Sequence, residues 1–212
     1  MYAHISGRRQ WGVTEYLILA NVIVYIVLSI AALNPIDVTG SFLFYLLAQV
    51  NFLVYEGFVY QLFTAMFVHL NILHLLSNMF FLYLFGKYLE GLFPRRTYLL
   101  VYFGGGLLGN ILTLALGPYL ISGGASGAIF SIYAFLIVIT YKTNQRSFRS
   151  ILFILILMLM LNSGLNTNSV AHAGGALFGL LYGYYILKRR FIVRRAPEER
   201  YYEYSYSSDE FW

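Results

Sequence analysis

Long apolar stretches, separated by short polar segments, dominate the pattern of hydrophobic and polar positions along this chain. A helix that crosses the hydrocarbon core of a bilayer needs about 20 residues, so the fourth and fifth of these stretches are short for a full crossing. The pattern predicts a bundle of six transmembrane helices, which comprise Thr14–Leu33, Leu70–Tyr88, Tyr98–Leu116, Ser126–Tyr141, Ile151–Leu165 and Val170–Leu187.

A seventh apolar segment, Ser41–Val54, has only 14 residues. If this segment crossed the membrane, Arg8 and Arg9 would lie on the opposite side from the other 12 of the 14 basic residues. We therefore interpret it as a re-entrant or interfacial element inside a large external loop, about Asn34–Tyr60, between the first two helices. A seven-helix arrangement is the alternative.

The composition supports a membrane protein. The chain has 212 residues, of which 59% are hydrophobic and only 11% are charged, whereas a soluble domain of this length needs more charge on its surface. The predicted class is therefore an all-α polytopic membrane protein. The chain contains no cysteine, which excludes a disulfide framework, a thiolate nucleophile and a cysteine metal site.

The basic residues predict the topology. They fall at the N-terminus, in the second and fourth loops and after the last helix, whereas the other three loops contain none. Under the positive-inside rule, both termini are cytoplasmic. We expect a cytoplasmic N-terminus at residues 1–13, a six-helix transmembrane domain at 14–190 and a flexible cytoplasmic tail at 191–212, in a multi-pass protein of the cell membrane.

A glycine-rich turn, Gly123–Gly127, places Ser126 at the start of the fourth predicted helix. A helix N-terminus offers free N–H groups and a partial positive charge, which suit a developing oxyanion. Only about 15 residues of helix follow, or roughly 23 Å, so Ser126 is expected below the outer membrane surface. Taken alone, Ser126 fits a helix N-cap or a small packing residue better than a nucleophile.

His172 lies at the outer start of the sixth predicted helix. Gly175, Gly179 and Gly183 follow it on the same helical face, so this face is smooth enough to pack closely against small residues of the fourth helix. Such contact would bring the imidazole within hydrogen-bond reach of the Ser126 hydroxyl. The alternative is a histidine that forms a structural hydrogen bond between helices.

His74 and Asn78 are four residues apart in the outer part of the second predicted helix, so they share one face. Both side chains can donate hydrogen bonds, and donors of this kind stabilise an oxyanion. The alternative is a polar contact that holds helices together.

Together, the three motifs place a nucleophile, a base and hydrogen-bond donors at one depth in lipid, which indicates a buried active site. A metal centre is disfavoured, because His69 and His74 are separated by about 140° around a helix. The external loops contain only Asp37 and Glu56 as carboxylates, so a Ser–His dyad is favoured over a triad.

These motifs resemble those of the rhomboid intramembrane serine proteases, and the resemblance covers about Tyr60 to Leu187. It also includes Gly86–Glu90, which is similar to a Gly-x-x-x-Glu segment of the family. The three main motifs are His-x-x-x-Asn, Gly-x-Ser-Gly and Ala-His-x-x-Gly-x-x-x-Gly, formed here by His74 and Asn78, by Gly124, Ser126 and Gly127, and by Ala171, His172, Gly175 and Gly179.

The resemblance implies a six-helix rhomboid domain with a water-filled cavity that cleaves transmembrane segments of other proteins through an acyl-enzyme. It implies Ser126 as the nucleophile, His172 as the general base, and an oxyanion hole formed by His74, Asn78 and the Ser126 N–H. The expected partners are transmembrane substrates and membrane lipids, with no nucleic acid, cofactor or metal, and a monomer is compatible with this activity.

Two rival functions are weighed against this one. A non-catalytic family member that binds and sorts membrane proteins would usually lack the serine or the histidine, and this chain has both. A transporter or channel would show inverted repeats or charged residues along a central path, which the sequence lacks.

The chain departs from the family pattern at two places. Many members carry Trp-Arg in the first loop where this chain has Tyr60 and Gln61, which leaves the anchoring of that loop open. Several members have a tyrosine four residues after the serine, where this chain has Phe130, whose ring can support His172 without a hydroxyl.

Overall fold

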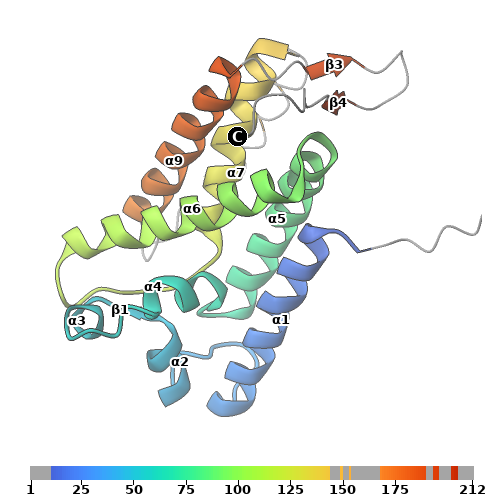
Figure 1. The fold of residues 1–212 in the computed structure, drawn as a ribbon. Helices are drawn as coiled ribbons and strands as arrows, with labels where there is room; N and C mark the ends of the chain where they lie inside the picture. Colours follow the sequence, from blue (N-terminus) through green and yellow to red (C-terminus); the bar gives the residue numbers. More distant parts are fainter. Residues whose placement is uncertain are drawn as a thin grey trace, which may run out of the picture.

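The computed structural model describes residues 11–143 and 168–189, the single residues Arg149 and Phe153, and the strands β3 (Val193–Arg195) and β4 (Tyr202–Tyr204). The fold is mostly helical (Figure 1). The described residues include four helices long and apolar enough to cross a membrane, and a shorter apolar helix, α7 (Ser126–Thr143). The four are α1 (Val13–Ala32), α5 (Ile72–Leu92), α6 (Arg95–Thr113, extended by a 3-10 turn to Leu116) and α9 (Ser169–Lys188).

Five of the six predicted helices are therefore present at nearly the expected positions. The predicted fifth span, Ile151–Leu165, lies outside the described residues except for Phe153, so the six-helix count stays a prediction. Helix α5 begins two residues later than predicted because the Asn71 side chain caps it, accepting a hydrogen bond from the His74 N–H at 2.9 Å.

The segment between α1 and α5 folds into short elements rather than a spanning helix, and Ser41–Val54 is divided among three of them. One of these, β1, pairs antiparallel with β2 (Ile121–Ser122), which directly precedes the glycine-rich turn. The short elements are α2 (Phe42–Leu47), β1 (Gln49–Val50), α3 (Asn51–Tyr55), α4 (Gln61–Thr64) and a 3-10 turn (Ala65–Phe67).

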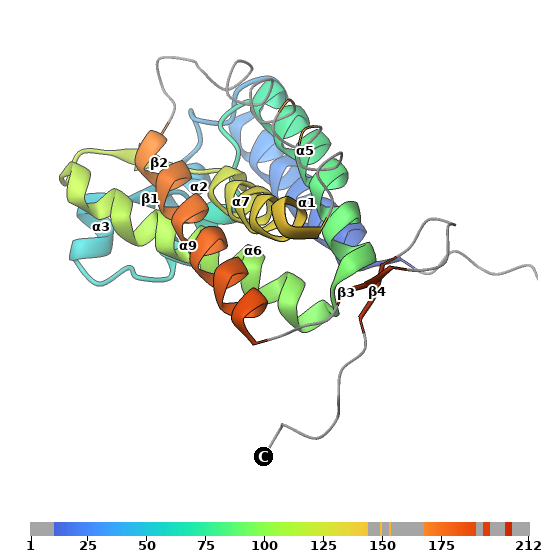
Figure 2. The same ribbon diagram turned by 90° about the horizontal axis from the view of Figure 1, so that it is seen from above.

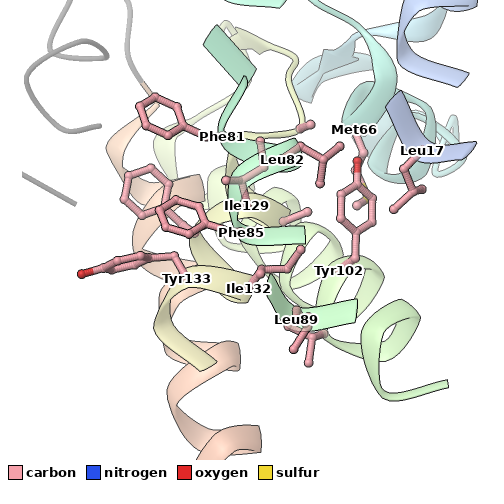
Figure 3. Packing of buried hydrophobic residues seen from close by; sticks show 14 of the residues in the cluster. Leu17, Met66, Phe81, Leu82, Phe85, Leu89, Tyr102, Ile129, Ile132 and Tyr133 are labelled. Atoms are coloured by element: carbon pink, nitrogen blue, oxygen red, sulfur yellow. The ribbon is translucent and has the colours of Figure 1, made fainter. Parts of the chain in front are cut away.

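Helix α7 occupies the centre of the bundle. It contacts α9, α6 and α5, and α1 packs on the far side of α5 (Figures 1 and 2). The largest buried side chains fill the space between α5, α7 and α6 (Figure 3). They include Phe81, Phe85 and Leu89 of α5, Ile129 and Ile132 of α7, and Tyr102 of α6.

Glycine brings α7 and α9 together at the level of their backbones. A Cβ atom on Gly175 would overlap the carbonyl oxygen of Gly127, and one on Gly179 would overlap the carbonyl oxygen of Ser131. The predicted smooth face of α9 is thus confirmed. Helix α9 also approaches α6 closely, because a Cβ on Gly109 would lie 2.5 Å from the Ala171 carbonyl oxygen.

A charged cluster joins α1 to the end of α5 that lies away from His74. The Glu90 carboxylate accepts a hydrogen bond from the Val13 N–H, at the start of α1. The Lys87 ammonium group bridges two carboxylates, at 2.8 Å from Glu90 and 3.0 Å from Glu15. The Gly86–Glu90 segment thus connects the end of α5 to the start of α1.

We expect Gly179→Ala to destabilise the bundle by about 1–3 kcal/mol, because the added methyl group has no space and forces α7 and α9 apart. The matched control is Gly91→Ala on α5, where nothing lies within 4 Å of a new Cβ. That change should be neutral or stabilise by about 0.5–1 kcal/mol. Unfolding in mixed detergent micelles measures both. Equal effects would contradict the close packing of α7 and α9.

Candidate active site

Ser126 is the first residue of α7 and follows a turn that only glycine tolerates easily. Gly124 has a φ of +137°, a backbone conformation that strains other residues. Its N–H donates to the Ala65 carbonyl at 2.9 Å, which fixes the turn to the segment before α5. A Cβ on Gly124 would lie 2.9 Å from the His74 ring and 3.7 Å from the Ser126 Oγ. Gly124 therefore lies between these two side chains, and a larger residue there would collide with the His74 ring.

His172 lies in the first turn of α9, and its Nε2 is 2.8 Å from the Ser126 Oγ. With the proton on Nδ1, the hydroxyl donates to Nε2, as a general base requires. The Phe130 ring of α7 stacks on the imidazole with a centroid distance of 4.3 Å and an interplanar angle of 22°. The structure therefore joins the serine and the histidine across two helices, and a phenyl ring supports the imidazole without a hydroxyl.

His74 and Asn78 lie one turn apart on α5. Asn78 is almost fully buried and donates one hydrogen bond to the His74 carbonyl at 2.8 Å. An amide nitrogen carries two hydrogens, so a second donor is left for another acceptor. His74 packs against the Gly124 turn, so its ring borders the approach to Ser126.

His69 lies next to His74, contrary to the sequence-based prediction that the two side chains point in different directions. Its angular separation from His74 was calculated for one continuous helix, but α5 starts only at Ile72. The two rings in fact pack edge to face, 5.0 Å apart, and the buried His69 Nε2 accepts from the Ala125 N–H at 3.5 Å. The sequence signal that could have identified His69 is that it is a further polar residue within an apolar stretch. The described residues contain no group of three or more acidic or histidine side chains arranged to hold a metal.

Gln61 anchors the segment after α1, where many members of the resembled family have arginine. Its fully buried amide accepts from the Val50 N–H at 2.9 Å and donates to the carbonyls of Tyr45 at 2.9 Å and Leu46 at 3.2 Å. A neutral side chain thus satisfies three backbone groups of α2 and β1. The departure at Gln61 preserves an anchor for this segment.

The fold and the helices define an integral multi-pass membrane protein. Residues 56–189 match the Rhomboid domain, a span that includes every residue of the site described above. The chain belongs to the rhomboid family.

Several relatives are similar to this chain. The putative rhomboid protease YdcA of Bacillus subtilis (strain 168) is 32% identical over 159 residues, which cover 71% of this chain and 75% of the relative. The rhomboid protease GluP of the same organism is 30% identical over 62% of this chain, but only 27% of the relative is covered. Rhomboid-like protein 11, chloroplastic, of Arabidopsis thaliana is 36% identical over 61% of this chain and 45% of its own length. The match therefore covers less than half of the latter two proteins.

We expect Gln61→Met to lower the free energy of unfolding by several kcal/mol, since it leaves three buried backbone groups unpaired at about 1–3 kcal/mol each. The neighbouring Tyr60→Met is the control, because the Tyr60 side chain is half-exposed. Unfolding in detergent micelles compares the two. If both variants unfold alike, the Gln61 amide does not anchor this segment.

Proposed function

We propose that this chain is an intramembrane serine endopeptidase that cleaves transmembrane segments of other membrane proteins. The observation that carries the proposal is the 2.8 Å separation between the Ser126 Oγ and the His172 Nε2. Membership of the rhomboid family supports it, as do relatives whose names describe rhomboid proteases.

The reaction would proceed by acyl transfer. His172 accepts the hydroxyl proton while the Ser126 Oγ attacks the scissile carbonyl carbon, forming a tetrahedral oxyanion. As this collapses, the C–N bond breaks, the imidazolium returns the proton to the leaving amine, and an acyl-enzyme is left. Water then attacks the acyl carbon while His172 accepts its proton, the C–O bond to Ser126 breaks, and the imidazolium returns the proton to the Ser126 Oγ. The proposal therefore requires water to reach Ser126.

The oxyanion would be stabilised by the Ser126 N–H and by two side chains of α5. The Ser126 N–H lies at the N-terminus of α7, where the helix dipole favours negative charge. The His74 ring borders the Gly124 turn, and Asn78 has a second amide hydrogen to donate. We assign Ser126, His74 and Asn78 to the oxyanion hole, with Gly124, Gly127, Phe130, Gly175 and Gly179 supporting the geometry.

The arrangement in the membrane belongs to the same proposal. Six helices, cytoplasmic termini and a large external loop would place the dyad toward the outer leaflet, as the basic residues predict. The substrates would be transmembrane proteins that reach the site within the bilayer, and a monomer holds every residue assigned to the chemistry.

Ser126→Ala and His172→Ala are each expected to abolish cleavage of a transmembrane substrate by the purified protein, because each removes one partner of the proton transfer. Cleavage in lipid vesicles, followed by gel analysis and mass spectrometry of the fragments, measures the loss. A variant that cleaves at the parent rate would overturn the dyad assignment.

A fluorophosphonate probe separates the protease from a non-catalytic protein that only binds membrane proteins. The probe should label Ser126 of the parent chain and leave both variants unlabelled. Binding of a transmembrane segment without labelling or cleavage would favour the non-catalytic alternative.

We expect Asn78→Ala to lower kcat by about 10²–10³-fold, the usual cost of losing one oxyanion donor. Asn21→Ala is a matched control, because Asn21 is also buried and donates to the carbonyl four residues earlier, that of Leu17, at 2.7 Å. It lies on α1 and should leave kcat unchanged. An equal fall in both variants would assign Asn78 a structural role only.

A further inference from the structure

Buried polar side chains connect residues 49–51, which comprise β1 and the start of α3, to α6 and to the start of α9. None of the connections follows from sequence proximity, because each hydrogen bond joins residues 55 to 62 positions apart. The side chains of Gln49, Asn51 and Thr113 are fully buried. Buried polar groups are costly unless paired, so such a row indicates a function for the contacts they make.

Asn168 is the end of this row that touches the site. Its side-chain Oδ1 accepts from the Ala171 N–H at 3.0 Å and so caps α9. Its backbone carbonyl accepts from the His172 N–H at 3.3 Å. Asn168 therefore forms the first turn of the helix on which the imidazole is mounted.

Asn168 differs from an ordinary N-cap because its amide nitrogen is also used. The Nδ2 donates to the Thr113 Oγ1 at 2.9 Å, and Thr113 in turn donates to the Gly109 carbonyl on α6 at 2.9 Å. Gly109 lies against the Ala171 carbonyl. The cap of α9 is thus tied sideways to α6, at the point where the two backbones approach most closely.

Thr113 is linked in turn to the first residue of α3. The Asn51 Nδ2 donates to the Thr113 carbonyl at 3.0 Å and to the Gly117 carbonyl at 2.7 Å. Gln49 donates to the carbonyl of Asn110, one turn earlier on α6, at 2.9 Å. The end of α6 is therefore held by two amide side chains from outside the helical bundle.

The same segment also holds the chain that leads to Ser126. Gln49 pairs with Ser122 in the β1–β2 ladder, and the Asn51 N–H donates to the Leu120 carbonyl at 3.1 Å. Ser126 follows Ser122 by four positions. Both partners of the proposed dyad are thus tied to residues 49–51, Ser126 through β2 and His172 through Thr113 and Asn168.

We propose that Asn168 is a positioning residue for His172, tied through Thr113 to the Gln49–Asn51 segment, which thereby sets the distance between imidazole and hydroxyl. This inference rests on the proposed function of the dyad. Without the sideways bond, the first turn of α9 is free to shift along α6 while remaining capped. A displacement of about 1 Å at a reacting group can cost about 10²-fold in rate.

Two variants remove the sideways bond without removing the cap. Asn168→Ser keeps a side-chain oxygen of similar capping strength but loses the amide group that reaches Thr113, and Thr113→Val loses the acceptor with little change in shape. Each should lower kcat by about 10- to 100-fold, with KM unchanged and the same fall in the rate of fluorophosphonate labelling. The double variant should fall no further, since both changes break one bond. Thr113→Ser should restore the rate.

Thr140→Val is the matched control. Thr140 is buried on α7 and, like Thr113, donates to the carbonyl four residues earlier, here that of Leu136 at 2.7 Å. Unlike Thr113, it accepts no hydrogen bond from Asn168. This variant loses the same kind of intrahelical bond and should keep its kcat. Amide hydrogen exchange of the first turn of α9 should accelerate in Thr113→Val and stay unchanged in Thr140→Val.

These measurements distinguish a failure of the proposed function from a failure of the positioning role of Asn168. A parent chain that neither cleaves nor labels would overturn the proposed function, and the exchange rates would still test whether Thr113 holds the start of α9. An active parent whose Asn168→Ser and Thr113→Val variants keep kcat would overturn the positioning role. Additive losses in the double variant, or equal losses in Thr140→Val, would overturn it as well.

Discussion

The close approach of the α7 and α9 backbones is the constraint on which the rest of the structure depends. Gly175 lies against Gly127, and Gly179 lies against Ser131, with no space for a side chain between them. Ser126 and His172 stand at the starts of these two helices, so the separation of their side chains is set by the distance between the helix axes. A serine hydroxyl and an imidazole can meet across two helices only if neither helix carries bulk at the interface. The glycines are therefore as necessary to the proposed chemistry as the reacting groups.

Satisfaction of polar groups explains the residues around this interface. Buried N–H and C=O groups have no water to pair with, so irregular backbone in the interior must find partners within the protein. The segment between α1 and α5 is irregular, and neutral amides supply those partners. Gln61 pairs with three backbone groups, and Asn51 caps the end of α6 through two carbonyls. A neutral amide meets these groups without the desolvation cost of burying a charge.

Local patterns in the sequence predicted the helices and the glycine face of α9, because helix length and glycine spacing depend on short-range periodicity. That face could be identified from the positions of Gly175 and Gly179 alone. The contact of Ser126 with His172 joins residues 46 positions apart, and it was inferred from that face together with the expected depth of the two helix starts. The contact of His69 with His74 could not be predicted, since it depends on where α5 begins. The same holds for the bonds of the Gln61 side chain and for those that Thr113 accepts from Asn51 and Asn168, which join residues 11 to 62 positions apart. Hydrophobic periodicity carries no information on which distant carbonyl a buried amide will find.

A dyad without an acidic third member must orient its histidine by other means. In a triad, a carboxylate fixes the tautomer and the plane of the imidazole. Among the described residues, the ion pairs made by Lys87 lie at the end of α5 away from the site. Besides the bond to Ser126, two neutral features of the described residues act on His172. The stacked Phe130 ring fixes the plane of the imidazole, and the capped first turn of α9 fixes its position along the helix axis. Orientation by packing avoids burying a carboxylate. It requires instead that the backbone of α9 be held in an accurate position, and the bond from Asn168 to Thr113 contributes to this.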